Sequence, residues 1–139
     1  MPLYNIACKT TLDNDQRQRI ADVITRTHCE LTGAPAEFVN VAFMEGLPLR
    51  EDEFFNVVGG VRSGGNRDLE MAANLQETMI ENIAGAANVS VSAVKVTLVG
   101  VPGNWNMEGG RVLPEPGAED EWLDRMEQAY GISRTTIIV

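Results

Sequence analysis

The feature that most constrains the fold of this chain is a strand–helix–strand pattern that occurs twice. In the first half, a short apolar stretch at residues 4–8 and an alternating stretch at residues 38–45 flank a helical segment. In the second half, residues 55–58 and 93–101 flank another helical segment. The paired strands begin about 36 residues apart in each half, and crossovers of this length connect parallel strands. The pattern predicts an α/β fold in which two strand–helix–strand units form a four-stranded sheet with two helices on one face.

Local signals place the ends of the two helices. Asp13 followed by Gln16 has the spacing of a capping box, and Gly33 followed by Pro35 is a stop signal. Asp68 is expected to begin the second helix. Apolar side chains then recur at helical spacing, at Ile20, Val23, Ile24, Thr27 and Leu31 in the first helix and at Leu69, Ala72, Leu75, Met79, Ile80 and Ile83 in the second.

Residues 59–67 are expected to form a glycine-rich loop that carries Arg62 and Arg67. Glycines allow the backbone to approach an anion closely, and arginine binds carboxylates through paired hydrogen bonds. The loop lacks the Gly-Lys-Ser/Thr ending of a nucleotide-binding loop, which argues against phosphate. A plain turn without any ligand is the alternative interpretation.

Residues 102–116 are expected to form a loop with a short extended piece at residues 111–113. Residues 119–130 are expected to form a helix with Trp122 and Met126 facing inward. We expect the sheet face away from the helices to be apolar as well, because the apolar strand residues cannot all point at the helices. These residues are Tyr4, Ile6, Val39, Val41, Val57, Val96 and Leu98. The apolar tail at residues 135–139 suits strand addition to a neighbouring subunit. We therefore expect an oligomer.

Composition bounds the function. A chain of 139 residues that is 44% hydrophobic suits one domain over residues 1–139. A net charge of −9 argues against nucleic acid, and the 11 basic residues are expected to bind a small anion where they cluster. No stretch resembles a membrane span or a signal peptide, and the two cysteines have no metal-like or disulfide spacing. We expect a cytoplasmic protein without metal or cofactor.

Pro2 lies directly before the first predicted strand, behind an initiator methionine that a small second residue allows to be removed. Removal would leave a secondary amine at the N-terminus. An α-amino group titrates at about 7.7 to 8.0, so such an amine held in a pocket can act as acid, base or nucleophile near neutral pH. The alternative is a frayed chain end without a role.

A proline start and two strand–helix–strand units resemble the tautomerase superfamily, and local patterns resemble cis-3-chloroacrylic acid dehalogenase and its homologues most. These patterns are Pro2 with Tyr4; Thr27-His28 before Leu31-Thr32-Gly33; Gly60 to Arg62 with Gly64 and Asp68-Leu69; and Glu108 with Gly110-Arg111, Leu113-Pro114, Pro116-Gly117 and Glu121-Trp122. The resemblance implies a tautomerase-like β-α-β fold and a homotrimer with Pro2 in a pocket near the subunit boundary.

The resemblance also implies roles for single residues. Pro2 matches the catalytic proline that moves a proton at carbon, and Glu108 matches the glutamate that activates water. His28 and Arg62 match residues that hold the substrate carboxylate. Each has a plainer interpretation, namely a buried helix histidine for His28, a turn residue for Arg62 and a solvated loop carboxylate for Glu108.

Two positions depart from the resemblance. Gly65 stands where a second carboxylate-binding arginine is expected, and Arg67 is a candidate substitute. Thr97 stands where a pocket tyrosine is expected. Because fewer charged hydrogen bonds polarise the substrate less, these changes predict weak dehalogenation.

Three functions stay open at this point. The first is a cofactor-independent enzyme acting on a small 2-oxo or 3-substituted unsaturated carboxylate, with phenylpyruvate-type tautomerisation and weak cis-3-haloacrylate hydration. Tautomerisation needs a neutral Pro2, whereas hydration needs a cationic one; Glu108 favours the cation and Arg62 the neutral amine. The second is an efficient cis-3-haloacrylate dehalogenase. The third is a non-catalytic binding or signalling oligomer on the same fold.

Overall fold

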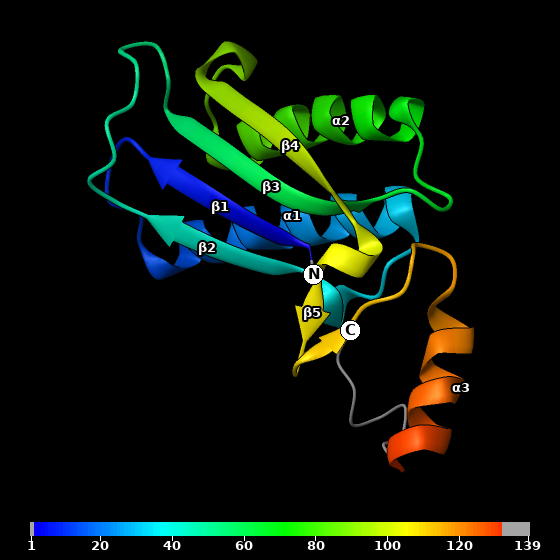
Figure 1. Ribbon diagram of the computed structural model, residues 1–139. Helices are drawn as coiled ribbons and strands as arrows, with labels where there is room; N and C mark the ends of the chain where they lie inside the picture. The colour runs from blue at the N-terminus through cyan, green and yellow to red at the C-terminus, as the bar shows by residue number, and fades with distance from the viewer. Residues whose placement is uncertain (1, 132–139) are drawn as a thin grey trace.

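The computed structural model describes residues 2–131 and shows a mixed α/β chain (Figure 1). Its strands and helices are, in order, β1 (Leu3–Cys8), α1 (Asn14–Thr32), β2 (Asn40–Met44), β3 (Phe55–Ser63), α2 (Leu69–Ala87), β4 (Val94–Pro102), β5 (Met107–Glu108), β6 (Arg111–Val112) and α3 (Glu119–Tyr130). Short 3₁₀ helices lie at Ala36–Phe38, Val91–Ala93 and Gly103–Trp105.

The main sheet has four strands in the order β2-β1-β3-β4. β1 and β2 are parallel, β3 and β4 are parallel, and β1 and β3 pair antiparallel where the two units meet. α1 and α2 lie together behind the sheet in Figure 1, while α3 lies apart from them beside the β5–β6 hairpin. The predicted fold class is confirmed.

The helix signals are confirmed as well. Asp13 and Gln16 form both hydrogen bonds of a capping box, and Gly33 ends α1 in the left-handed conformation. The Asp68 side chain accepts a hydrogen bond from the backbone N–H of Met71 at the start of α2. Leu69 and Ala72 depart from the predicted apolar stripe, because both are exposed at the start of α2, Leu69 to 90%.

The glycine-rich loop is shorter than predicted. Residues 59–63 continue β3, since Gly59 and Gly60 pair with β1 on one side and β4 on the other. A Cβ atom on Gly59 would lie 2.6 Å from the ring of Tyr4. Glycine at this position of β3 therefore leaves room for that ring. The turn is confined to residues 64–67, and Arg62 lies on a strand, not in a loop.

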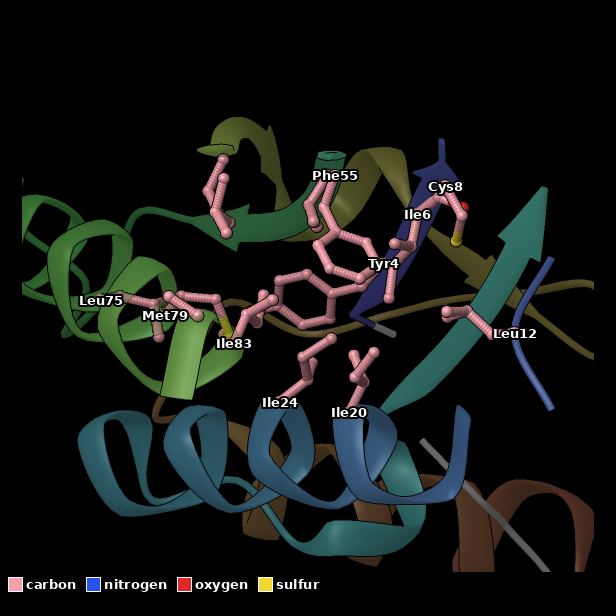
Figure 2. Packing of buried hydrophobic residues seen from close by; sticks show 14 of the residues in the cluster. Tyr4, Ile6, Cys8, Leu12, Ile20, Ile24, Phe55, Leu75, Met79 and Ile83 are labelled. Atoms are coloured by element: carbon pink, nitrogen blue, oxygen red, sulfur yellow. The ribbon is translucent and has the colours of Figure 1, made fainter. Parts of the chain in front are cut away.

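The core lies between the sheet and the helix pair. Figure 2 shows Tyr4 in its middle, with Ile20 and Ile24 reaching up from α1 and Met79 and Ile83 lying on α2. Each of these five side chains is at most 1% exposed. Burying an aliphatic side chain of this size contributes about 1.5 to 3 kcal/mol, so this layer holds the two helices on the sheet.

The predicted division of strand residues between the sheet faces is wrong. Register places residues 4, 41, 59 and 98 in one row, and all seven side chains named above belong to, or pack against, the helix-side core. The opposite face is mixed: Leu3, Met44, Val58 and Val99 are 37 to 47% exposed, among Asn5, Asn56, Lys95 and Thr97 in neighbouring rows. Side chains two residues apart on a strand point to the same face, and the strand register aligns these positions, so all seven can lie on the helix side.

α3 forms a second, smaller cluster, as predicted for residues 119–130. Trp122 and Leu113 are buried, and Phe38, Leu123 and Met126 pack against them. The Trp122 indole N–H donates to the carbonyl of Val112 over 2.8 Å. None of the helices in the described part of the chain is long and apolar enough to cross a membrane. The predicted strand at residues 135–139 lies outside the described residues.

Candidate active site

The candidate site begins where β1 begins. Pro2 is buried, and its carbonyl oxygen accepts hydrogen bonds from the backbone N–H of Asn40 over 3.0 Å and from the Asn40 side chain over 3.3 Å. The antiparallel pair Leu3–Gly60 brings the far end of β3 alongside, which places Arg62 near the start of the chain. Pro2 and Leu3 are thus held between β2 and β3 by backbone hydrogen bonding and strand pairing.

His28 and Tyr4 form a buried pair. His28 is fully buried on α1, and the Tyr4 hydroxyl lies 2.7 Å from its Nδ1 atom. Burial raises the pKa of the Tyr4 phenol. Burial, followed by the charge of Arg67, lowers the pKa of His28 to about 3. Both groups are therefore neutral at pH 7, and with the phenol donating to Nδ1 we assign the imidazole proton to Nε2.

Two buried side-chain nitrogens have no hydrogen-bond partner within residues 2–131, namely His28 Nε2 and Arg67 Nε. After burial, the charge of Arg67 is the next cause that lowers the pKa of His28, and it also acts to lower the pKa of Tyr4. Burial and the nearby Arg62 lower the pKa of Arg67. Buried donors without acceptors are rare because each costs about 1 to 3 kcal/mol. A buried cationic donor of this kind suits an anionic acceptor such as a carboxylate.

The turn explains why no arginine stands at position 65. Gly65 has φ +57°, and a Cβ atom there would lie 2.0 Å from the carbonyl oxygen of Pro116. A side chain at this position would collide with the backbone of residue 116, which packs over the turn. Arg67, whose backbone N–H bonds to the Gly64 carbonyl over 3.0 Å, is the cation that this turn presents instead.

Arg62 is engaged by the segment that leads into α3. Its Nη1 donates to the carbonyl of Pro114 over 2.9 Å, and its Nη2 lies 2.6 Å from Oε1 of Glu119. The other carboxylate oxygen of Glu119 accepts the backbone N–H of Gly117 over 2.8 Å. Burial opposes ionisation of Glu119, but the hydrogen bond and charge of Arg62, together with hydrogen bonds from the backbone of Glu119 and Gly117, outweigh it and leave the Glu119 pKa lowered. Both terminal nitrogens of Arg62 are therefore used within the chain.

A cavity of about 370 Å³ opens beside these groups. The end of α1 and the following loop form one wall, the turn at residues 64–67 forms the second, and the start of α3 forms the third. Arg62, Arg67, Glu119 and Asp120 supply its charged lining, whereas Phe38 and Leu123 supply apolar side chains. This mixture can hold an organic acid with its carboxylate toward Arg67 and its remainder against the apolar wall.

The other predicted residues lie elsewhere in the chain. Glu108 lies opposite Arg111 in the antiparallel register of the β5–β6 hairpin. Figure 1 draws this hairpin below the N-terminal end of β1. Thr97 is exposed on β4, beside Val58 on the face away from the helices. Neither lines the cavity of Arg62 and Arg67. Of the predicted site residues, Arg62 and Arg67 line the cavity, whereas Pro2 and His28 are buried and are not part of its lining. Roles for Pro2, His28, Glu108 and Thr97 stay predictions.

Sequence reasoning missed two partners, Tyr4 for His28 and Glu119 for Arg62. Tyr4 was noted as a strand residue and as part of the Pro2–Tyr4 pattern, and Glu119 as the first residue of a predicted helix, but neither was assigned a partner. A carboxylate at a helix start just after Gly117 was the sole local signal for Glu119. Within the described range, no three His, Cys, Asp or Glu side chains are grouped so that they could hold a metal ion.

Comparisons with known proteins agree with the observed fold. Residues 1–126 match the model of a family described as "Putative oxalocrotonate tautomerase enzyme". The crystal structure of N1, a member of the cis-3-chloroacrylic acid dehalogenase family, is similar with a TM-score of 0.80 and 26% identity, covering 91% of this chain and 94% of that one. Native Ps01740 is similar with a TM-score of 0.62 and 28% identity, covering 76% and 99%.

A fused 4-OT wild-type asymmetric trimer shares the fold with a TM-score of 0.70 and 19% identity, covering 79% of this chain and 94% of that one. A search of curated protein sequences found no match.

Proposed function

The chain belongs to the tautomerase superfamily, in the oxalocrotonate tautomerase-like family whose model matches residues 1–126, and from this premise we propose a cofactor-independent enzyme that uses Pro2 to move a proton. Its substrates are small 2-oxo or 3-substituted unsaturated carboxylates. Phenylpyruvate-type tautomerisation is its main reaction.

One observation carries the proposal, namely the pair of unpartnered buried donors at His28 Nε2 and Arg67 Nε. A substrate carboxylate would accept from both and remove the cost of leaving them unsatisfied. Arg62 adds positive charge to the same cavity lining, while its two terminal nitrogens are held by Pro114 and Glu119. Arg67 is therefore the favoured direct contact, and Arg62 stays a second candidate.

The proposed proton transfer requires Pro2 as a free secondary amine after loss of Met1. The nearby positive charges of Arg62 and Arg67 favour its neutral form. The amine accepts the enol proton as the C2–O bond becomes a carbonyl, and the resulting cation delivers a proton to C3. The carboxylate contact holds C3 of the substrate next to the amine. Because the two reacting groups are already positioned, the entropic part of the barrier to proton transfer is lowered.

The experiment that tests this reaction compares two forms of the protein by intact mass and by turnover of phenylenolpyruvate. The form that begins at Pro2 should be active, and a form that retains Met1 should lose activity because acylation removes the amine's basicity. Equal turnover by both forms would exclude Pro2 as the proton carrier.

Arg67→Ala tests the carboxylate contact. We expect kcat/KM to fall by about 10², consistent with about 3 kcal/mol for a charge-assisted hydrogen bond, mainly through KM. Arg125→Ala, which removes an exposed arginine of α3, is the matched control and should change little. An equal effect from both variants would remove Arg67 from the site.

Hydration of cis-3-haloacrylates is the second candidate, favoured by the likeness to a cis-3-chloroacrylic acid dehalogenase family member. It would use a cationic Pro2 to protonate C2 and Glu108 to direct water to C3. We expect it to be slow, because Gly65 and Thr97 replace an arginine and a tyrosine. Glu108→Gln should damage hydration by about 10² to 10⁴ and tautomerisation far less. Efficient hydration with negligible tautomerisation would reverse this ranking.

We also propose a homotrimer in the cytoplasm. The open sheet face carries Leu3, Val58 and Val99 at 38 to 47% exposure, which a neighbouring subunit would cover. Thr97 lies on this same face, where it could reach only a neighbour's site. A non-catalytic binding oligomer is the remaining alternative, and activity that is lost in Pro2→Ala would exclude it.

A further inference from the structure

The ion pair between Arg62 and Glu119 places a carboxylate of the chain itself inside the anion site. Glu119 bonds to Arg62 over 2.6 Å and lines the same cavity as Arg67. We propose that Glu119 acts as an internal carboxylate that occupies Arg62 and restricts the site to substrates with one carboxylate. This inference rests on the proposed function and adds the charge class of its substrate.

Glu119 is held firmly in this role. Its Oε2 accepts the Gly117 N–H while its Oε1 contacts Arg62, so both oxygens are used. It is also the first residue of α3, where the partial positive charge of a helix N-terminus favours a carboxylate. On the other side, the Arg62 side chain is only 5% exposed and also donates to Pro114. A ligand carboxylate would therefore have to displace an ordered, ionised partner to reach Arg62.

The charges around the cavity have the same consequence. Two arginines, Arg62 and Arg67, face two acidic residues, Glu119 and Asp120, along the lining. One substrate carboxylate can take the cationic donor of Arg67. A second carboxylate would meet Glu119 with Arg62 already neutralised, and like charges in such a site disfavour binding strongly.

A purely structural role for Glu119 makes a different prediction. If the ion pair only ties α3 to β3, its loss should weaken all ligands alike or none. If Glu119 selects by charge, its loss should help only ligands with a second carboxylate. Glu119→Gln separates the two, because the amide keeps the shape of the side chain and removes its charge.

The experiment is calorimetric titration at pH 7.5 with three inert probes that share one ring. Phenylacetate carries one carboxylate. The other two probes, 2-carboxyphenylacetate and 4-carboxyphenylacetate, carry a second carboxylate at a shorter and a longer distance from the first. The wild type should bind phenylacetate at least about tenfold more tightly than either dicarboxylate. Glu119→Gln should raise the affinity for at least one dicarboxylate about tenfold and leave phenylacetate within about threefold. Glu119→Asp, which retains the charge, should keep the wild-type preference.

The matched control is Glu121→Gln, which removes an exposed charge from the same first turn of α3 but does not line the cavity. It should leave the preference unchanged. Equal gains for all probes in Glu119→Gln, or the same gain in Glu121→Gln, would overturn the selective role. Equal binding of one and two carboxylates by the wild type would overturn it too, whether or not any variant folds. If the wild type bound none of the probes, the carboxylate site of the proposed function would itself be wrong.

Discussion

Replacing Tyr4 with phenylalanine tests the buried pair at the centre of the site. The variant keeps the ring, which is fully buried and meets the His28 ring edge-on with centroids 5.8 Å apart. It removes only the hydroxyl that lies 2.7 Å from His28 Nδ1. Because no volume beyond one oxygen atom is lost, any large effect must come from the hydrogen bond.

The expected loss of stability follows from the partners of His28. Nε2 already lacks a partner within the described range, so loss of the Tyr4 hydroxyl would leave both ring nitrogens of a fully buried imidazole unsatisfied. One unsatisfied buried acceptor costs about 1 to 3 kcal/mol. At about 4 °C per kcal/mol for a domain of this size, the melting temperature should fall by about 4 to 12 °C.

Turnover should respond in a characteristic way. Without the phenol, the neutral imidazole is free to hold its proton on Nδ1, and Nε2 then cannot donate to the substrate. We expect KM for phenylenolpyruvate to rise by about three- to tenfold while kcat changes less, because the proton transfer at Pro2 does not pass through His28.

The assays are thermal unfolding, denaturant unfolding and steady-state kinetics on Tyr4→Phe, His28→Gln and the double variant. Tyr130→Phe is the matched control, since this tyrosine is 61% exposed and its ring contact with Arg111 survives the change. It should alter the free energy of unfolding by less than about 0.5 kcal/mol. If Tyr4→Phe behaved like Tyr130→Phe, or if its effect simply added to that of His28→Gln, the two side chains would not form the proposed pair.

Three further predictions concern the turn, the acid stability and the assembly. Gly65→Ala should destabilise the protein by more than about 1 kcal/mol in denaturant unfolding, because its Cβ would meet the Pro116 carbonyl at 2.0 Å; Gly46→Ala, also at positive φ but with nothing within 4 Å, is the control and should cost less. The pKa of His28 in the folded protein is lowered from 6.5 to about 3. Between these two pH values the unfolded chain binds a proton at His28 and the folded chain does not. Stability should fall as pH decreases from 6.5 towards 3, and His28→Gln should reduce that slope by up to about 1.4 kcal/mol per pH unit; an unchanged slope would contradict the neutral, buried state of His28. Sedimentation at micromolar concentration should give a trimer, and a monomer there would remove the shared pocket from the proposal.

The fold was largely determined by local sequence signals. The Asp13 capping box, the Gly33 stop and the start at Asp68 define where α1 and α2 begin or end, and these signals act within a few residues. The double strand–helix–strand pattern then leaves few topologies, since parallel pairs need long crossovers. For these reasons the four-stranded sheet and both helices were predictable from the sequence alone.

The environment of the site was decided only by tertiary structure. The pairings of Tyr4 with His28 and of Arg62 with Glu119 join residues 24 and 57 positions apart, so nothing in the local pattern could predict them. The same holds for the close approach of Pro116 to Gly65, which explains the missing arginine. Sequence named His28, Arg62 and Arg67 as anion ligands, but burial and long-range contacts decide which donors are occupied and which are open. The Tyr4–His28 contact depends on how β1 packs against α1, and the Arg62–Glu119 contact on how β3 packs against the start of α3. Such packing is a property of the whole chain.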